Sequence, residues 1–459
     1  MLKRVKLKDI SKAIGSGITP LRSNPLYWEN GTIPWLKTEQ LGESEIYDTS
    51  EKITQFAIDD TSIKIFPVNT LSIAMYGEGR TRGNVSILKA EMATNQACCN
   101  IIVDEEKAYY KYVYYFLKTQ YENLRSLSSG VRKNLNSNDI KEFGILLPDD
   151  LRTQKRIASI LSSLDAKISL NNRINAELEA MAKTIYDYWF VQFDFPDKKG
   201  KPYKASGGKM VWSEELKREI PEGWEVKQLQ ELGDFKNGVN YDPSNPGKVA
   251  CPIINVRNIS ASSYFLKNED LDIIYLNESD VKKYAVHQGS IIIARSGIPG
   301  ATRLIADIAD NTLYCGFAIH YELNNLDIKI PVFFYLKSIE QQIQNGSGGT
   351  ILKNVNQATL NVLKIALPQD EEVILRFNKL IRPIFHKLNL IQKENQKLTE
   401  LRDWLLPMLM NGQIKIKDAE HLSSKALAKD EKSYFTIATE DKLAMAAESE
   451  LHYSRKSSK

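Results

Sequence analysis

Two short segments of the chain each combine a cation with two side-chain amides. They are residues 133–136 (Lys-Asn-Leu-Asn) and residues 353–356 (Lys-Asn-Val-Asn), and glycines precede both. An ammonium group can neutralise a phosphate or donate to guanine, and an asparagine amide can form two hydrogen bonds with adenine. These segments therefore predict contacts with DNA. An Asn-rich turn whose side chains satisfy their own backbone is an equally open interpretation of the asparagines alone.

Further cationic or amide side chains occupy the neighbouring predicted loops. The complete set of candidate DNA contacts is Lys37, Arg80, Arg82, Arg132, Lys133, Asn134, Asn136, Arg257, Asn258, Arg295, Lys353, Asn354 and Asn356.

A second group of residues suggests hydrolytic chemistry. Asp197, Glu215 and Lys217 follow a P-D…E-x-K nuclease pattern, in which two carboxylates and a lysine could hold Mg²⁺ against a phosphate. Such short patterns arise by chance, and Asp197 lies in a polar segment rich in lysine and glycine. A linker followed by a helix start is therefore the favoured interpretation, and a metal-dependent nuclease is kept as an alternative.

The two amide segments belong to a long internal repeat. A constant offset of 220 residues relates Lys133 to Lys353, Pro148 to Pro368 and Asp150 to Asp370. A repeat this long indicates a duplicated domain rather than a solenoid, whose repeats are about 20–50 residues. Each copy contains short strand-like runs, a glycine-punctuated loop and one short helix, which predicts an α+β protein with two similar domains of mixed α/β structure.

Each predicted domain continues into a long amphipathic helix that begins after an acidic pair or an acidic residue. Apolar residues recur there at spacings of three and four, the pattern of a coiled-coil seam. The predicted seam consists of Ile157, Leu161, Leu164, Ile168, Asn175, Leu178, Ile381, Ile384, Leu388, Asn395 and Leu398. Asn175 and Asn395 fall on equivalent positions, where an asparagine costs stability but fixes the register. We expect the two helices to pack antiparallel and to hold the domains apart; ordinary core helices are the alternative.

These patterns divide the chain into six parts. We predict a first domain over 1–148, a long helix over 149–192, a surface linker over 193–220, a second domain over 221–368, a second long helix over 369–412 and a flexible tail over 413–459.

Composition restricts the function classes further. The net charge is +4, and the 42% apolar share can support real cores. No Walker-type phosphate loop is present, so ATP-driven chemistry is not encoded here. Four cysteines without a C-x-x-C pair and few histidines argue against a structural zinc site and against disulfides. No apolar run reaches membrane-spanning length and no secretory signal is evident, so we expect a cytoplasmic protein without membrane contact.

At this point the chain resembles the specificity subunit of type I restriction–modification systems. The residues that carry the resemblance are 154–158 (Gln-Lys-Arg-Ile-Ala), 161–165 (Leu-Ser-Ser-Leu-Asp), Trp189-Phe190, 193–196 and Gly223-Trp224, together with Asn95-Gln96. The second half departs from this pattern, because Ile374 stands where Gln154 does and Leu313-Tyr314 replaces an Asn-Gln pair.

The resemblance implies a non-catalytic subunit that binds double-stranded DNA. Two target-recognition domains would each read one half of a split, asymmetric site. The helices would set the spacer and dock two methyltransferase subunits, which restriction subunits would join. The chain itself would need no cofactor, because S-adenosylmethionine, ATP and Mg²⁺ would be bound by the partners. A coiled-coil scaffold without a DNA role remains the other alternative.

Overall fold

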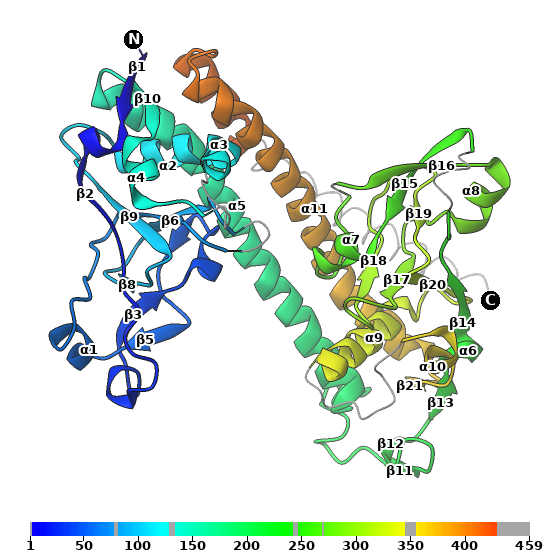
Figure 1. Ribbon diagram of the computed structural model, residues 1–459. Helices are drawn as coiled ribbons and strands as arrows, with labels where there is room; N and C mark the ends of the chain where they lie inside the picture. The colour runs from blue at the N-terminus through cyan, green and yellow to red at the C-terminus, as the bar shows by residue number, and fades with distance from the viewer. Residues whose placement is uncertain are drawn as a thin grey trace. The chain divides into compact units, whose positions relative to one another are not determined.

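The structure, a computed structural model, describes residues 2–77, 81–127, 134–241, 247–268, 270–344 and 355–428. The chain forms two compact units (Figure 1). Unit 1 contains residues 1–169 and 398–459, and unit 2 contains residues 170–397. Both boundaries fall inside long helices, α5 (Leu151–Tyr186) and α11 (Glu371–Met410). Unit 1 is therefore assembled from both ends of the chain, whereas unit 2 is a single continuous segment.

Unit 1 contains a five-stranded sheet, a three-stranded sheet and a terminal strand pair. The five-stranded sheet has the order β2-β9-β6-β7-β4, with bounds Ser11–Ser16, Cys98–Val103, Leu71–Ala74, Val85–Leu88 and Glu45–Ile46. The three-stranded sheet has the order β5-β3-β8, with bounds Glu51–Ile53, Ile33–Leu36 and Ala93–Thr94. The pair consists of β1 (Leu2–Lys6) and β10 (Gly144–Pro148). The helical elements are η1 (Leu7–Ile10), η2 (Pro25–Tyr27), η3 (Thr38–Gln40), α1 (Gln55–Asp59), α2 (Tyr110–Thr119), α3 (Tyr121–Ser126) and α4 (Ser137–Glu142).

Unit 2 repeats this plan. Its four-stranded sheet has the order β14-β20-β17-β18, with bounds Gly233–Asn237, Ala318–Leu323, Ile291–Ala294 and Thr302–Leu304. Its three-stranded sheet has the order β16-β15-β19, with bounds Asp272–Leu276, Val249–Ile254 and Leu313–Tyr314. The terminal pair consists of β13 (Trp224–Gln228) and β21 (Lys364–Pro368). The remaining elements are β11 (Met210–Ser213), β12 (Arg218–Pro221), α6 (Leu229–Leu232), α7 (Val256–Ser260), α8 (Glu278–Tyr284), α9 (Lys329–Gln344) and α10 (Gln357–Asn361).

Most strand pairings of one unit have a counterpart in the other, whereas the pairing of β4 with β7 in unit 1 and that of β11 with β12 in unit 2 have no counterpart among the strand pairs. In unit 1, β9 lies between β2 and β6 and pairs antiparallel with both, as β20 does between β14 and β17 in unit 2. In both units the other sheet contains one parallel pair, β3 with β8 and β15 with β19. The α+β fold and the predicted internal repeat are therefore confirmed. The central strands β6 and β17 are buried along their whole length, which explains why their sequences lack polar alternation.

The two predicted long helices are present. After Tyr186, α5 continues into a π-helical segment, η4 (Asp187–Val191). Gln154 anchors the start of α5, because its side chain accepts from the backbone N–H of Tyr109 at 2.8 Å and donates to the carbonyl of Pro148 at 3.0 Å. Ile374, the equivalent residue of α11, is buried without such bonds being possible for its side chain.

The predicted seam residues also belong to the cores of the units. Ile157, Leu161, Leu164 and Leu398 are buried in the core of unit 1, which includes α2. Ile381, Ile384 and Leu388 are buried in the core of unit 2, with Leu178 packed against it. Within unit 2 the helices run antiparallel, because Asn171 contacts Asn395 whereas Tyr186 contacts Phe377. Each helix is thus both a partner of the other helix and a core element of a unit.

The asparagines of the seam differ from the predicted arrangement. Asn395 accepts a hydrogen bond from Asn171 Nδ2 at 2.9 Å and donates one to Asn172 Oδ1 at 2.9 Å. Asn171 is only 1% exposed. Asn175, the predicted equivalent of Asn395, has a buried Oδ1 with no hydrogen-bond partner among the described residues. Two neighbouring amides, rather than a matched pair, therefore connect the helices in unit 2.

Two predicted segments outside the domains are more ordered than expected. The segment 193–220, predicted as a surface linker, packs into unit 2: Phe193 and Phe195 are buried and both contact Trp224. The described part of the predicted flexible tail, 413–428, is helical from 416 onward and packs against unit 1. There Ala419 is fully buried, and Arg156 of α5 forms two hydrogen bonds of 2.9 and 2.8 Å with Glu420. The burial of Ala419 and the ion pair between Arg156 and Glu420 explain why this segment is not loose.

Candidate nucleic-acid interface

The strand register brings three loops of unit 1 to one edge of its sheet. Ser16 at the end of β2 is opposite Cys99, and Ala74 at the end of β6 is opposite Cys98 at the start of β9. The loops after β2, after β6 and before β9 therefore meet. Leu135 joins them, because its backbone N–H donates to the carbonyl of Met75 at 3.2 Å. We call this set of described residues, 17–24, 75–77, 81–84, 95–97 and 134–136, the loop end of unit 1.

The same register defines a loop end in unit 2. Asn237 of β14 is opposite Ile319, and Ala294 of β17 is opposite Ala318 at the start of β20. Arg295 contacts the loop before β20, since its backbone N–H donates to Phe317 O at 2.9 Å and its Nη1 donates to Gly316 O at 3.0 Å. The loop end of unit 2 comprises residues 238–241, 295–301, 315–317 and 355–356.

A glycine directly after β2 in unit 1, and one directly after β14 in unit 2, permit the close approach of these loops. A Cβ on Gly17 would lie 1.9 Å from the carbonyl oxygen of Thr94, and one on Gly238 would lie 2.2 Å from that of Cys315. The residue after each glycine donates to the same strand in both units: Ile18 N to Thr94 O and Val239 N to Tyr314 O, each at 2.9 Å. The contact that assembles the loop end is therefore the same in both units.

Several predicted DNA contacts of unit 1 lie at or beside its loop end. Lys37 directly follows β3, and its Nζ pairs with Glu39 and with Glu51, the latter at 2.7 Å. The hydrogen bond to Glu39, and next the one to Glu51, raise the pKa of Lys37. Arg82 and Asn134 are half-buried in this group of loops. Arg80, Arg132 and Lys133 lie outside the described residues. The described cation Lys37 is thus already neutralised by carboxylates.

The predicted contacts of unit 2 are distributed differently. Arg295 is half-buried and held by the carbonyl of Gly316. Arg257 belongs to α7, beside the loop end, and pairs with Asp272 of β16 at 2.6 Å. Asn258 is only 5% exposed and its side chain accepts from the backbone of Asn255 in a capping box, which speaks against a base contact. Lys353 and Asn354 lie outside the described residues.

The second asparagine of each amide segment caps a helix. Asn136 accepts from the N–H of Asp139 and Asn356 from that of Thr359, both at 2.9 Å, at the starts of α4 and α10. A side-chain acceptor at this position satisfies one of the unpaired N–H groups of a helix start. The backbone interpretation left open by the sequence therefore accounts for Asn136 and Asn356, and it fixes the position where each preceding loop ends.

The loop before β9 contains residues that the sequence did not single out as contacts. Thr19 donates from Oγ1 to the side-chain carbonyl of Gln96, and Gln96 is exposed. In unit 2 the matching turn contains Phe317, which is 63% exposed. The parallel strands align Thr94 with Tyr314, so Asn95-Gln96 corresponds to Cys315-Gly316 and not to Leu313-Tyr314. The exposure of Gln96 and Phe317 distinguishes them as candidates, and the sequence alone does not reveal that exposure.

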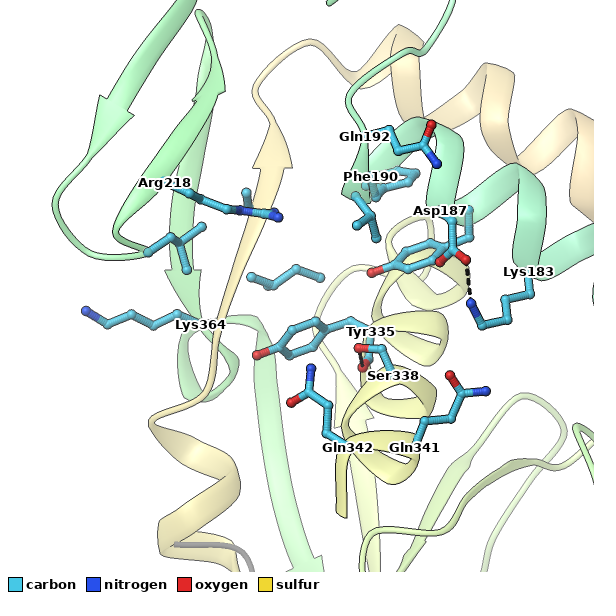
Figure 2. Close-up of a pocket in the computed structure, with 15 residues that line it drawn as sticks. Lys183, Asp187, Phe190, Gln192, Arg218, Tyr335, Ser338, Gln341, Gln342 and Lys364 are labelled. Atoms are coloured by element: carbon cyan, nitrogen blue, oxygen red, sulfur yellow. Dashed lines mark hydrogen bonds and ion pairs between the residues drawn. The ribbon is translucent and has the colours of Figure 1, made fainter. Parts of the chain in front are cut away.

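A pocket of about 550 Å³ in unit 2 lies elsewhere, between η4, β12, α9 and β21. Figure 2 shows Lys183 paired with Asp187 at its rim, while Lys364 pairs with Glu215 at 3.0 Å. Burial raises the pKa of Tyr335 to about 12 and lowers that of Arg218. Asp187 is the single carboxylate among the residues that line this pocket, so the lining offers no carboxylate pair for a metal.

The nuclease alternative finds no assembled site in the described residues. Asp197 accepts from the backbone N–H groups of Lys201 and Lys199 at 2.8 and 2.7 Å, and these bonds, chiefly that from Lys201, lower its pKa. Glu215 pairs with Lys364, and Lys217 pairs with Glu214 at 2.8 Å. No group of three or more His, Cys, Asp or Glu side chains in the described residues could hold a metal ion.

Among the described helices none is long and apolar enough to cross a membrane.

Comparisons with known proteins give a consistent result. The family described as "Type I restriction modification DNA specificity domain" matches residues 2–180 and 221–402. The type I restriction enzyme MjaIX specificity subunit of Methanocaldococcus jannaschii is 27% identical over 427 residues, covering 90% of this chain and 93% of that protein. The HindI specificity subunit of Haemophilus influenzae is 27% identical over 348 residues, covering 62% and 72%. The crystal structure of an S subunit from M. genitalium matches with a TM-score of 0.55 at 18% identity, covering 89% and 96%, and supports the fold.

Proposed function

Because the chain belongs to the family of type I restriction modification DNA specificity domains, we propose that it selects the DNA sequence on which a restriction–modification complex acts. Each unit reads one half of a bipartite, asymmetric site with its loop end. The chain itself performs no bond chemistry in this proposal. S-adenosylmethionine, ATP and Mg²⁺ belong to the methyltransferase and restriction subunits that it recruits.

One observation carries the proposal: both units use the same frame to present different side chains. The pairings of β2 and β14, the close approaches at Gly17 and Gly238 and the caps at Asn136 and Asn356 recur. The side chains on this frame differ. Two similar frames with unlike contact residues suit a target with two unlike halves, and base edges in the major groove distinguish all four base pairs.

The described cations near the loop ends are mostly engaged within the chain, as shown for Lys37 and Arg257. In the proposal, phosphate neutralisation is therefore assigned to Arg80, Arg132, Lys133 and Lys353, which remain candidates from the sequence. Phosphate contacts hold a protein in register, whereas base contacts provide specificity.

The length of the helices supports a role in fixing the unread spacer of the site. The 36 residues of α5 correspond to about 54 Å at 1.5 Å per residue. Inserting one helical turn into both α5 and α11 should change the spacer length that the complex accepts. An unchanged spacer preference would refute this part of the proposal.

An exposed apolar stripe on α5 supports docking of methyltransferase subunits. Leu170, Ile174 and Met181 are 48%, 36% and 46% exposed and follow one another at intervals of four and seven residues. Such spacing places them on one helix face. We expect Met181→Glu to abolish co-purification with the methyltransferase subunit, whereas Ala180→Glu, at an exposed position on another face, should not.

The central experiment is selection of bound duplexes from a randomised library by the full chain with its methyltransferase subunits. A split consensus with two unlike halves is expected. Binding should also weaken steeply with added salt, because phosphate contacts release counterions. Binding that is indifferent to salt and sequence would instead favour a scaffold without a DNA role.

A further inference from the structure

We infer that the turn before β9 and the turn before β20 supply the base-reading contacts, with Gln96 reading adenine in unit 1 and Phe317 contacting a thymine methyl in unit 2. This inference rests on the proposed function and assigns residues to it. The two turns occupy equivalent places on the shared frame. Their exposed side chains nevertheless have opposite chemistry, one an amide and the other a phenyl ring.

The backbone bonds of the two turns establish their equivalence. Asn95 N donates to Leu36 O at 2.9 Å, and Cys315 N donates to Ile254 O at 3.0 Å. Cys98 N donates to Asn95 O at 3.3 Å, and Ala318 N donates to Cys315 O at 2.9 Å. The third residue of each turn accepts from the strand end beside it: Ala97 O from Met75 N at 2.8 Å and Phe317 O from Arg295 N at 2.9 Å. Both turns are therefore held by matching backbone hydrogen bonds at equivalent places on the shared frame.

In unit 1 the loop after β2 positions the side chain of Gln96. Thr19 lies two residues after Gly17, and its hydroxyl donates to Gln96 Oε1. This bond orients the amide and leaves one lone pair of Oε1 for a base. In the described part of the chain nothing accepts from Gln96 Nε2. An oriented amide with one donor and one acceptor free matches N7 and N6 of adenine.

In unit 2 the same two positions have been reassigned. Gly316 stands in the place of Gln96 and is packed against Asn240, whose Oδ1 would lie 1.9 Å from a Cβ on that glycine. Arg295 Nη1 donates to the carbonyl of Gly316, so the guanidinium positions the turn. The next residue, Phe317, is 63% exposed although large apolar side chains are usually buried. A phenyl ring at a fixed tip can contact the C5-methyl group of thymine.

Neutrality separates these residues from phosphate contacts. Neither a glutamine nor a phenylalanine can neutralise a phosphate, so neither should contribute to the salt dependence of binding. Both should act on the preference for particular bases. The test therefore measures sequence preference and salt dependence separately.

The experiment is selection from a randomised duplex library by the full chain in complex with its methyltransferase subunits. Gln96→Ala should reduce the preference for adenine at one position of one half-site by roughly 5- to 150-fold, the range for one bidentate base contact. The other half-site should be unchanged. Gln96→Glu, which replaces the donor by an acceptor, should shift the preferred base at that position to cytosine. Thr19→Val should weaken the same preference, and Thr19→Ser should retain it.

Phe317→Ala provides the matched variant in unit 2. It should reduce the preference for thymine at one position of the other half-site only, and Phe317→Leu should retain part of it. If Gln96→Ala and Phe317→Ala bind with wild-type preferences, or weaken all sequences equally, the inference is wrong and the proposed function stands. If the wild-type complex selects no split sequence, both are overturned.

Discussion

The two asparagines that the sequence places on equivalent seam positions should respond in opposite ways to replacement by leucine. Asn395 connects Asn171 and Asn172 through two hydrogen bonds, whereas Asn175 has a buried carbonyl oxygen without a partner in the described residues. Removing a buried polar atom that has no partner is favourable, while removing one member of a satisfied pair leaves the other unsatisfied. All four residues lie within unit 2.

The magnitudes follow from burial. An unsatisfied buried polar group costs about 1–3 kcal/mol. Asn175 is only partly buried, so we expect Asn175→Leu to raise the free energy of unfolding by about 1 kcal/mol, at the low end of that range. Asn395→Leu strands the Nδ2 of Asn171, which is 1% exposed, so we expect a loss of about 2 kcal/mol. The double variant Asn171→Leu with Asn395→Leu removes both partners and should recover most of that loss.

The assay is urea unfolding, monitored by hydrogen–deuterium exchange of peptides from α9. These peptides report on unit 2 separately from unit 1. Asn172→Ala is the control, because this exposed residue loses one bond that water replaces, and the change should stay within about 0.5 kcal/mol. The reasoning is refuted if Asn395→Leu is as stable as the wild type, or if Asn175→Leu is less stable.

The other predictions concern a pH dependence, an ion pair and the tail. Burial lowers the pKa of His320 to about 4, so the unfolded state binds more protons than the folded state as the pH falls from about 6.5 to about 4. The free energy of unfolding of unit 2 should therefore fall by about 3 kcal/mol over that window. Urea unfolding measured at each pH should show that His320→Phe removes this loss. Arg402 pairs with the largely buried Asp165 at 3.0 Å, so Arg402→Met should destabilise unit 1 by about 3 kcal/mol, and adding Asp165→Leu should restore most of it; equal stabilities of the two variants would contradict this. A chain ending at Gly412 loses the contact of the fully buried Ala419, so exchange in α2 should become faster; unaltered exchange would show that the tail helix does not stabilise unit 1.

The duplicated fold could be predicted from the sequence because the repeated residues lie in regular strands and helices. The strands before α5 and α11, and the buried runs of β6 and β17, have the same chemistry in both copies. The alignment of Asn95-Gln96 with Cys315-Gly316 also follows from the sequence, because the offset of 220 residues that relates Lys133 to Lys353 relates Asn95 to Cys315 as well. The pairing with Leu313-Tyr314 departed from that offset by two residues, and the register of β3 with β8 and of β15 with β19 corrects it.

The candidate contacts were predicted by residue type, and type does not reveal a partner. Lys37 and Arg257 have the right charge, but carboxylates on the same unit already engage them. Asn136 and Asn356 have the right amide, but a helix start uses it. Conversely, Gln96 and Phe317 become candidates only when exposure and the neighbouring turn are known. The tail offered too few apolar residues to predict that Ala419 would be buried.

The interleaved make-up of the units reverses the order in which they can be completed during synthesis. Every residue of unit 2 has left the ribosome once position 397 has emerged. Unit 1, although encoded first, still lacks the end of α11 and the 416–428 helix at that moment. Because domains fold as units during translation, the nascent amino-terminal half must wait with an open core face until the last stretch of the polypeptide arrives.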